Sequence, residues 1–214
     1  ETPAFQRAID NNERVRLPML TVVTQHSMTL ILGTFAATAT FVIFYLMTVF
    51  SLSWGTSALG YSREVFLVLQ MIGVLFFALT IPVSAVIADR RGRFAMLIAA
   101  TLGIMAFGLF FAPLFSAASP VRVVIFLALG LGLMGLTYGP LGTALSELFP
   151  TSVRYTGASL TFNLAGIVGA SLAPYVATWL ATHYGLAYVA YYLTAAGALT
   201  LLSLLLIRRP SPQL

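Results

Sequence analysis

Six apolar runs of at least about 20 residues divide the sequence, and they constrain its fold more than any other feature. A helix needs about 20 apolar residues to cross a hydrocarbon core of roughly 30 Å. Backbone polar groups inside a bilayer must be satisfied within the spanning element, which a helix of this length achieves. The runs therefore predict an all-α membrane protein with six transmembrane helices, at residues 28–53, 65–88, 94–117, 123–146, 157–182 and 186–207.

The composition of the chain excludes several classes of function. Of its 214 residues, 59% are hydrophobic and 8% are charged, whereas soluble domains carry about 25% charged residues. The net charge of +5 does not indicate a nucleic-acid partner, because the arginines stand in short clusters between apolar runs. Cysteine is absent, and the two histidines, His26 and His183, are far apart. We therefore expect no disulfide, no metal site and no cofactor.

Polar segments precede and follow the apolar runs. Residues 1–24 are polar and charged, and we interpret them as a linker or an interfacial stretch before a bundle that covers residues 25–209. Residues 210–214 form a short tail. Glu1 is not an initiator methionine, so we expect the chain to begin within a longer protein.

The arginines predict the orientation of the helices, because positive residues in short loops stay on the cytoplasmic side. With the N-terminal end in the cytoplasm, two arginines fall outside, Arg63 and Arg122. The other nine fall inside: Arg7, Arg14, Arg16, Arg90, Arg91, Arg93, Arg154, Arg208 and Arg209. We therefore expect both ends of the chain to be cytoplasmic.

A short charged turn, residues 88–93 (ADRRGR), joins the second and third apolar runs. Gly92 permits the tight reversal, and Asp89 is suited to cap or pair with a helix N-terminus. Arg90, Arg91 and Arg93 are suited to carboxylates or lipid phosphates. An ordinary positive loop would explain the same residues, so the turn alone does not specify a family.

A second loop carries a longer pattern, residues 138–142 (YGPLG), 146–151 (SELFPT) and 153–159 (VRYTGAS), followed by 166–169 (GIVG). Together with the charged turn, this pattern resembles the metabolite:proton symporters of the major facilitator superfamily. Two positions depart from the family's turn signature, Ala85 in place of glycine and Phe94 in place of a basic residue.

The resemblance implies helices seven to twelve of a twelve-helix protein, which form one half-bundle of two three-helix inverted repeats. The partner would be the missing N-terminal six-helix half, and the protein would lie in a bacterial inner membrane in contact with lipid. Members of this family carry α-ketoglutarate, citrate, shikimate, proline or betaine. The expected function is proton-coupled symport of a small organic acid or zwitterion by alternating access.

The resemblance also suggests roles for the charges at the cytoplasmic helix ends. We expect Glu147 to pair with Arg154 and with Arg91 or Arg93, and so to hold one face closed in one state of the transporter. Asp89 is expected to reach the missing half. Loss of the Glu147 charge would shift the protein toward its inward-open state.

Polar side chains within the runs are the candidates for a substrate cavity, since no carboxylate, histidine or basic residue lies deep in any run. From a helical rise of about 1.5 Å per residue, we expect Thr38 and Asn163 near mid-bilayer, Tyr45 and Gln70 in the outer third, and Tyr138 in the inner third. Asn163 ranks first, because an amide both donates and accepts. The alternative for each is a hydrogen bond between helices.

Small residues four apart predict close contacts between spanning helices. Gly135 and Gly139 have this spacing, and Gly166 and Gly169 are each followed by an alanine four residues later. The string GLGLMG at 130–135 matches a dinucleotide-binding pattern, but it lies inside a predicted helix rather than after a strand.

A membrane enzyme and an assembly module are the alternatives to transport. An enzyme needs an acid, a metal cluster or a nucleophile at the interface, and the sequence shows no such group, so we expect none. An isolated six-helix module that dimerises, with no transport of its own, is compatible with the sequence. Six further spans upstream in the reading frame would favour the transporter.

Overall fold

The computed structural model describes residues 17–115 and 119–207. The first 16 residues of the predicted linker, the predicted tail at 210–214 and five of the arginines used for orientation lie outside these ranges. In chain order, the helical elements are α2 (Pro18–Gln25), α3 (Ser27–Tyr45), the π-helical segment η1 (Leu46–Phe50), α4 (Ser51–Ser57), α5 (Arg63–Arg91), α6 (Arg93–Phe115), α7 (Pro120–Glu147), α8 (Arg154–Tyr184) and α9 (Leu186–Leu206).

Six helices are long and apolar enough to cross a membrane, which confirms the predicted all-α membrane fold. The first, Ser27–Ser57, combines α3, η1 and α4, and the other five are α5 to α9. α5 and α8 begin at Arg63 and Arg154, a little before the apolar runs that predicted them. Their first turns are polar, because the ends of a spanning helix lie outside the hydrocarbon.

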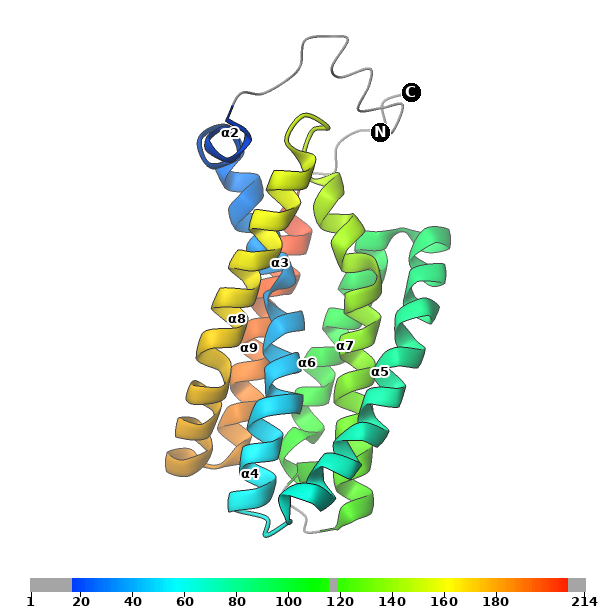
Figure 1. The fold of residues 1–214 in the computed structure, drawn as a ribbon, viewed down its shortest axis with the longest axis vertical. Coiled ribbons are helices and arrows are strands. Elements are labelled where there is room, and N and C mark those ends of the chain that lie inside the picture. The colour runs from blue at the N-terminus through cyan, green and yellow to red at the C-terminus, as the bar shows by residue number, and fades with distance from the viewer. Residues whose placement is uncertain (1–16, 116–118, 208–214) are drawn as a thin grey trace.

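The six spanning helices stand side by side in one bundle (Figure 1). The most extensively packed pairs include α5 with α7, α3 with α8 and α6 with α9. The first three spans correspond in order to the last three, so α3 matches α7, α5 matches α8 and α6 matches α9. Under this exchange the α3–α8 pair becomes the α7–α5 pair, and the α6–α9 pair maps onto itself. The packing therefore follows the two three-helix repeats expected of a major facilitator half-bundle, with α5 and α8 at opposite edges of the view.

The short helix α2 occupies the last part of the segment interpreted as a linker. Pro18 stands in its first turn, where the missing backbone N–H is harmless. Val22 is fully buried and packs with Phe149 and Val153 in the loop that precedes α8. α2 is therefore attached to the end of the bundle, close to α8 (Figure 1).

The larger hydrophobic cluster of the core includes a group of buried phenylalanines near α4. Phe115 stacks on Phe126 with ring centroids 4.4 Å apart, and Phe111 meets Phe126 edge-on at 4.9 Å. Phe50 and Phe66 pack on Phe115 from the first two spans, and all five rings are buried. Aromatic pairs contribute about 0.5–1.5 kcal/mol beyond the area they bury, so this cluster ties four spans together.

Gly135 and Gly139 lie where α7 approaches α5. A Cβ atom at Gly135 would lie 2.7 Å from the Phe77 carbonyl oxygen, and one at Gly139 would lie 2.7 Å from that of Ile81. The Ser84 hydroxyl donates to the Gly135 carbonyl oxygen at 3.2 Å. The absence of side chains at these two positions lets the helix backbones come into contact.

Of the two predicted glycines on α8, Gly169 lies in a close contact and Gly166 does not. A Cβ atom at Gly169 would lie 2.6 Å from Phe41 Cβ and 3.2 Å from the Thr38 carbonyl oxygen. At Gly166 the nearest atom belongs to the Phe41 ring, at 3.6 Å, which is an ordinary contact. The expectation of close packing at Gly166 is therefore wrong, because only a flat ring faces it there.

Candidate functional site

The turn between α5 and α6 brings charged groups together at one end of the bundle. α5 ends at Arg91, and Gly92 has a φ of 95°, a conformation that residues with a Cβ atom rarely adopt. α6 begins at the next residue, Arg93. This reversal places Asp89, in the last turn of α5, beside Arg93 in the first turn of α6.

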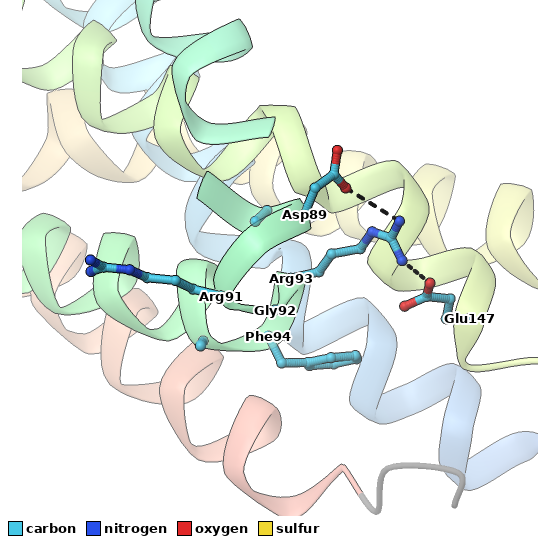
Figure 2. A pocket seen from close by; sticks show the side chains of 8 residues that line it. Asp89, Arg91, Gly92, Arg93, Phe94 and Glu147 are labelled. Carbon is cyan, nitrogen blue, oxygen red and sulfur yellow. Dashed lines mark hydrogen bonds and ion pairs between the residues drawn. The ribbon is translucent and has the colours of Figure 1, made fainter. Parts of the chain in front are cut away.

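Arg93 forms ion pairs with acids from two helices (Figure 2). Its Nη2 lies 3.5 Å from Asp89 Oδ1, and its Nη1 donates to Glu147 Oε1 at the end of α7. The side chains of Arg93 and Glu147 are 33% and 43% exposed, so water and salt screen their attraction. This network joins the charged turn to the start of the α7–α8 loop, beside a hollow of about 290 Å³.

The other predicted partners of Glu147 point elsewhere. Figure 2 shows Arg91 projecting from the far side of the turn, away from Glu147. Arg154 donates from Nε to the Phe149 carbonyl oxygen at 3.3 Å, and within the described residues it forms no ion pair with Glu147. The expected Arg154–Glu147 pair is absent because the loop between them folds back on itself and gives Arg154 a backbone acceptor. Asp89, expected to reach a missing half, contacts Arg93 in this structure.

The first span changes its helical register at η1. The Ser51 backbone N–H donates to the Leu46 carbonyl oxygen, five residues back, instead of to that of Met47. The Met47 carbonyl oxygen accepts from the Ser51 hydroxyl and from Gln70 Nε2, the latter at 2.9 Å. Gln70 Nε2 also lies 2.8 Å from the Thr48 carbonyl oxygen. A side chain from α5 thus satisfies backbone groups of the first span.

Two of the predicted cavity residues belong to the packed interior, and a third is partly buried against it. Gln70 is buried against η1, and Thr38 is 4% exposed, with its hydroxyl donating to the Thr34 carbonyl oxygen at 2.9 Å. Tyr45 is partly buried and meets Phe44 edge-on at 5.1 Å. Thr38 and Gln70 therefore do not line a cavity in this bundle, whereas Tyr45 keeps part of its surface exposed and its cavity role stays a prediction. Depth in the membrane was estimated from position along the helix, but rotation about the helix axis decides the face.

Asn163 lies on an exposed face of α8, as a cavity residue should. Its amide nitrogen donates to the Ser159 carbonyl oxygen, one turn earlier, at 2.8 Å. Asn163, Ser159 and Tyr155 help to line a hollow of about 240 Å³ between α7 and α8. The side-chain carbonyl oxygen of Asn163 remains free to accept a hydrogen bond, and Ser159 and Tyr155 carry hydroxyl groups in the same hollow.

Tyr138 belongs to a row of aromatic rings that runs from α5 across α7 to α8. Its ring centroid lies 5.8 Å from that of Phe77 and 6.5 Å from that of Phe162. Phe162 meets Phe41 of α3 edge-on at 5.0 Å and also lines the hollow beside Asn163. Sequence analysis identified Tyr138 but not Phe41, Phe77 or Phe162. Phenylalanines are equally typical of lipid-facing positions, so their type carried no signal.

In the described residues, no group of three or more His, Cys, Asp or Glu side chains is arranged to hold a metal ion. His26 lies edge-on to Phe149 with ring centroids 6.3 Å apart, and His183 stacks on Trp179 at 5.0 Å. The site therefore consists of a breakable ion-pair network, an exposed amide and aromatic faces. These groups are suited to recognition and to conformational change.

Comparison with known proteins decides the family. Residues 6–207 match the family described as "Sugar (and other) transporter". The chain belongs to this major facilitator family. This transporter-family chain is 46% identical over 211 residues to an inner membrane metabolite transport protein of Escherichia coli, a match that covers 96% of the chain and 48% of the relative.

Two further relatives agree with this assignment. A putative metabolite transport protein of Haemophilus influenzae is 40% identical over 225 residues, which cover 100% of the transporter-family chain and 50% of that protein. A shikimate transporter of Escherichia coli is 31% identical over 172 residues, 77% of the chain and 38% of that protein. The chain thus spans about half the length of the first two relatives. All three relatives are named as transport proteins rather than as enzymes.

Proposed function

We propose that this chain is the C-terminal half of a secondary active transporter that moves a small organic acid or zwitterionic metabolite together with a proton. The observation that carries the proposal is the ion pair between Arg93 and Glu147. It joins the two loops that hold the sequence pattern, in a chain whose relatives are named as metabolite transport proteins. Alternating access needs such a link, because one end of the bundle must be held together in one state and released in the other.

The substrate class is suggested by the relatives and by the exposed polar groups. Relatives are named as transporters of shikimate and of proline and betaine. A citrate-proton symporter of Salmonella typhi is 31% identical over 150 residues, 69% of this chain and 34% of that protein. Asn163 offers an amide and Tyr138 a hydroxyl group, which bind carboxylates and hydroxyl groups. Organic acids and zwitterions carry these groups.

In this proposal, an N-terminal six-helix half supplies the proton-binding group and the opposite wall of the cavity. The carboxylates, histidine and arginines of this chain's described spans lie near the helix ends, so a second half is needed to carry the proton at depth. The outward faces of α5 and α8, with Leu75, Leu79 and Val83 on α5 and Leu172 and Tyr175 on α8 more than half exposed, are available to a partner bundle or to lipid. The protein lies in a bacterial inner membrane with both ends of this chain in the cytoplasm.

Uptake by the reconstituted protein tests the proposal. The full reading frame that encodes this chain is expressed and placed in liposomes with an inward proton gradient, and labelled dicarboxylates, shikimate, proline and betaine are supplied. We expect uptake of one class, abolished by a protonophore. Asn163→Ala should raise the KM for that substrate, whereas Gln25→Ala, an exposed change on α2, should leave it unaltered.

The alternative is a six-helix module that dimerises without transport, which the exposed apolar faces of α5 and α8 also permit. Absence of uptake by a folded, correctly inserted protein, together with a dimer of the 214-residue chain in detergent, would favour this module. Uptake that persists without a proton gradient would keep transport and exclude proton coupling.

A further inference from the structure

Gln70 makes a set of contacts that the proposed transport function leaves unexplained. It lies in the third turn of α5 and is 9% exposed. Its Nε2 lies 2.9 Å from the Met47 carbonyl oxygen, 2.8 Å from that of Thr48 and 3.2 Å from Ser51 Oγ. An amide nitrogen carries two hydrogens, so it serves two of these three acceptors at a time. All three belong to η1 or to the residue that follows it.

These contacts favour the π-helical register over the α-helical one. A π turn holds one extra residue and leaves backbone groups without their usual partners, and such turns are frequent at functional sites. Here the Ser51 N–H reaches back to Leu46, and the Met47 carbonyl oxygen accepts instead from the Ser51 hydroxyl group and from Gln70 Nε2. A buried carbonyl without a donor is destabilising. Gln70 supplies one of these donors from a neighbouring helix and also reaches the Thr48 carbonyl oxygen, so its amide favours the π register.

A second contact fixes α4 against the start of α5. The ring of Phe66, one turn before Gln70, packs so closely on Gly55 that no Cβ atom would fit there. The Tyr61 backbone N–H donates to the Gly55 carbonyl oxygen at 3.1 Å. The apolar contact at Gly55 and the hydrogen bonds of Gln70 together set the position of α4, at the end of the bundle opposite the Arg93–Glu147 pair (Figure 1).

We propose that Gln70 is a positioning residue for transport, whose amide holds η1 in the π register and so fixes α4 at this end of the bundle. Loss of the amide shifts the equilibrium of η1 toward the α-helical register and so displaces α4, which follows it in the span. Gln70 acts through the position of α4 and does not touch the substrate. Its effect on uptake rests on the proposed function, whereas the register is a property of this chain alone.

Two substitutions separate the hydrogen bonds of Gln70 from its packing. Gln70→Leu keeps most of the volume and removes both donors. Gln70→Glu keeps the shape, and its carboxyl group donates one hydrogen bond when protonated and none when ionised. Gln25→Glu, on the exposed face of α2, makes the same chemical change away from η1 and is the matched control.

Spin labels on introduced cysteines report the position of α4, since the chain has no cysteine of its own. A label pair at Ser53 and Val121, both exposed at the α4 end, measures the distance between α4 and α7. A pair at Val121 and Tyr188 measures the distance between α7 and α9 and is the control that does not involve α4. The measurement uses the full-length protein in nanodiscs, with any cysteines outside this chain replaced. We expect Gln70→Leu to shift or broaden the first distance distribution and to leave the second unchanged. The register equilibrium should move about eightfold, which corresponds to about 1.2 kcal/mol for two hydrogen bonds in a membrane.

The pH dependence distinguishes positioning from simple loss of packing. In Gln70→Glu, the Ser53–Val121 distance should return toward the wild-type value as the pH falls from about 8 to about 4, below the usual glutamate pKa of about 4.3, because protonation restores one donor. Gln70→Leu and Gln25→Glu should show no such change. The maximal uptake rate should fall in both Gln70 variants while the KM stays constant.

An unchanged Ser53–Val121 distribution in folded Gln70→Leu, or a pH-independent one in Gln70→Glu, would overturn the proposal. If Gln70→Leu fails to fold, the pH series on Gln70→Glu still decides. A displaced α4 in a protein that takes up no substrate would support the hydrogen bonds as the cause of the π register and would contradict the transport function instead.

Discussion

At the residue scale, Arg93 holds two acids at once, Asp89 in the preceding helix and Glu147 at the end of α7. Its place as the first residue of α6 sets its guanidinium between these two helix ends. A guanidinium presents five donors in a fixed plane and so binds two carboxylates with defined geometry. Because all three side chains are partly exposed, the network is sensitive to salt and is weak enough to open and close.

Glu147→Gln should loosen this end of the bundle and favour the state that is open there. Exposed ion pairs contribute about 0.2–1 kcal/mol, so the population shift should be up to about fivefold. It is measured as the rate at which an impermeant thiol reagent labels a cysteine introduced at Ser159, which lines the hollow between α7 and α8. Glu64→Gln removes an acid at the opposite end and is the control. Equal labelling rates in the wild type and in Glu147→Gln would rule out the role of the pair as a gate.

Tyr61 carries a buried hydroxyl group that has no hydrogen-bond partner among the described residues. Burial raises the pKa of Tyr61, because the phenolate form is poorly solvated there. Tyr61→Phe removes the unsatisfied group and retains the ring contact with Phe66, whose centroid lies 5.9 Å away. We expect thermal unfolding in detergent to show unchanged stability or a gain of up to about 1 kcal/mol. A clear loss would show that the hydroxyl group has a partner in the membrane.

At the element scale, α5 depends on α7 for its place in the bundle. Most of its surface is exposed, and its most extensive packing is with α7. Contact between the two backbones at Gly135 and Gly139, with the hydrogen bond from Ser84, holds the pair together. In a membrane, apolar side chains gain little by leaving lipid, so close backbone packing carries much of the stability of such a pair.

Gly135→Ala should separate α5 from α7. The new Cβ atom would meet the Phe77 carbonyl oxygen, which cannot move without disturbing its own helix, and we expect a loss of about 1–3 kcal/mol in unfolding free energy. Gly132→Ala, on the same helix, is the control, because a Cβ atom there would lie 3.9 Å from its nearest neighbour, Thr80 Cγ2. Its free energy of unfolding should be unchanged or slightly higher, because alanine favours the helix. Thermal unfolding in detergent compares the two variants. Similar stability of both would contradict the backbone contact as the main link.

The π-helical segment illustrates what sequence analysis missed at this scale. The apolar run at 28–53 predicted a single helix, and the residues Leu46–Phe50 have no composition that distinguishes a π turn from an α turn. Gln70 was identified from its own polarity, but its partners are backbone carbonyls of another span. Backbone acceptors carry no residue identity, so a sequence pattern cannot reveal them.

At the scale of the whole molecule, burial is uneven among the spans. In an apolar 18-residue stretch of each spanning helix, 67% of the stretch is buried inside the bundle for the first span, against 17% for α5 and 28% for α8. The first span is therefore central in this bundle, and α5 and α8 keep the largest surfaces free. The chain spans about half the length of the first two relatives, and these two surfaces are the largest that its own bundle leaves uncovered.

The orientation in the membrane is testable with single cysteines in a chain that has none. If the arginine-rich end faces the cytoplasm, a cysteine introduced at Pro150 should be protected from an impermeant maleimide in intact cells and labelled in inverted vesicles. A cysteine at Ser57, exposed at the α4 end, should show the reverse pattern. Labelling of both positions from the same side would contradict the six-span topology, and a mirror-image pattern would reverse the orientation.

The sequence by itself determined the number, type and approximate position of the spanning helices and the residues of the charged turn. This was possible because the requirement to cross a bilayer acts on each segment separately: run length, backbone satisfaction and turn chemistry are all local. The tight reversal at Gly92 and the proximity of Asp89 to Arg93 follow from the same short stretch of chain.

Only the tertiary structure decided which polar side chains face one another. It selected Arg93 rather than Arg91 or Arg154 for Glu147, buried Thr38 and Gln70, and left Asn163 accessible. These outcomes depend on the rotation of each helix about its axis and on its neighbours. In runs that are apolar on nearly every side, no hydrophobic face marks that rotation, so it is set by packing between helices that are distant in the sequence.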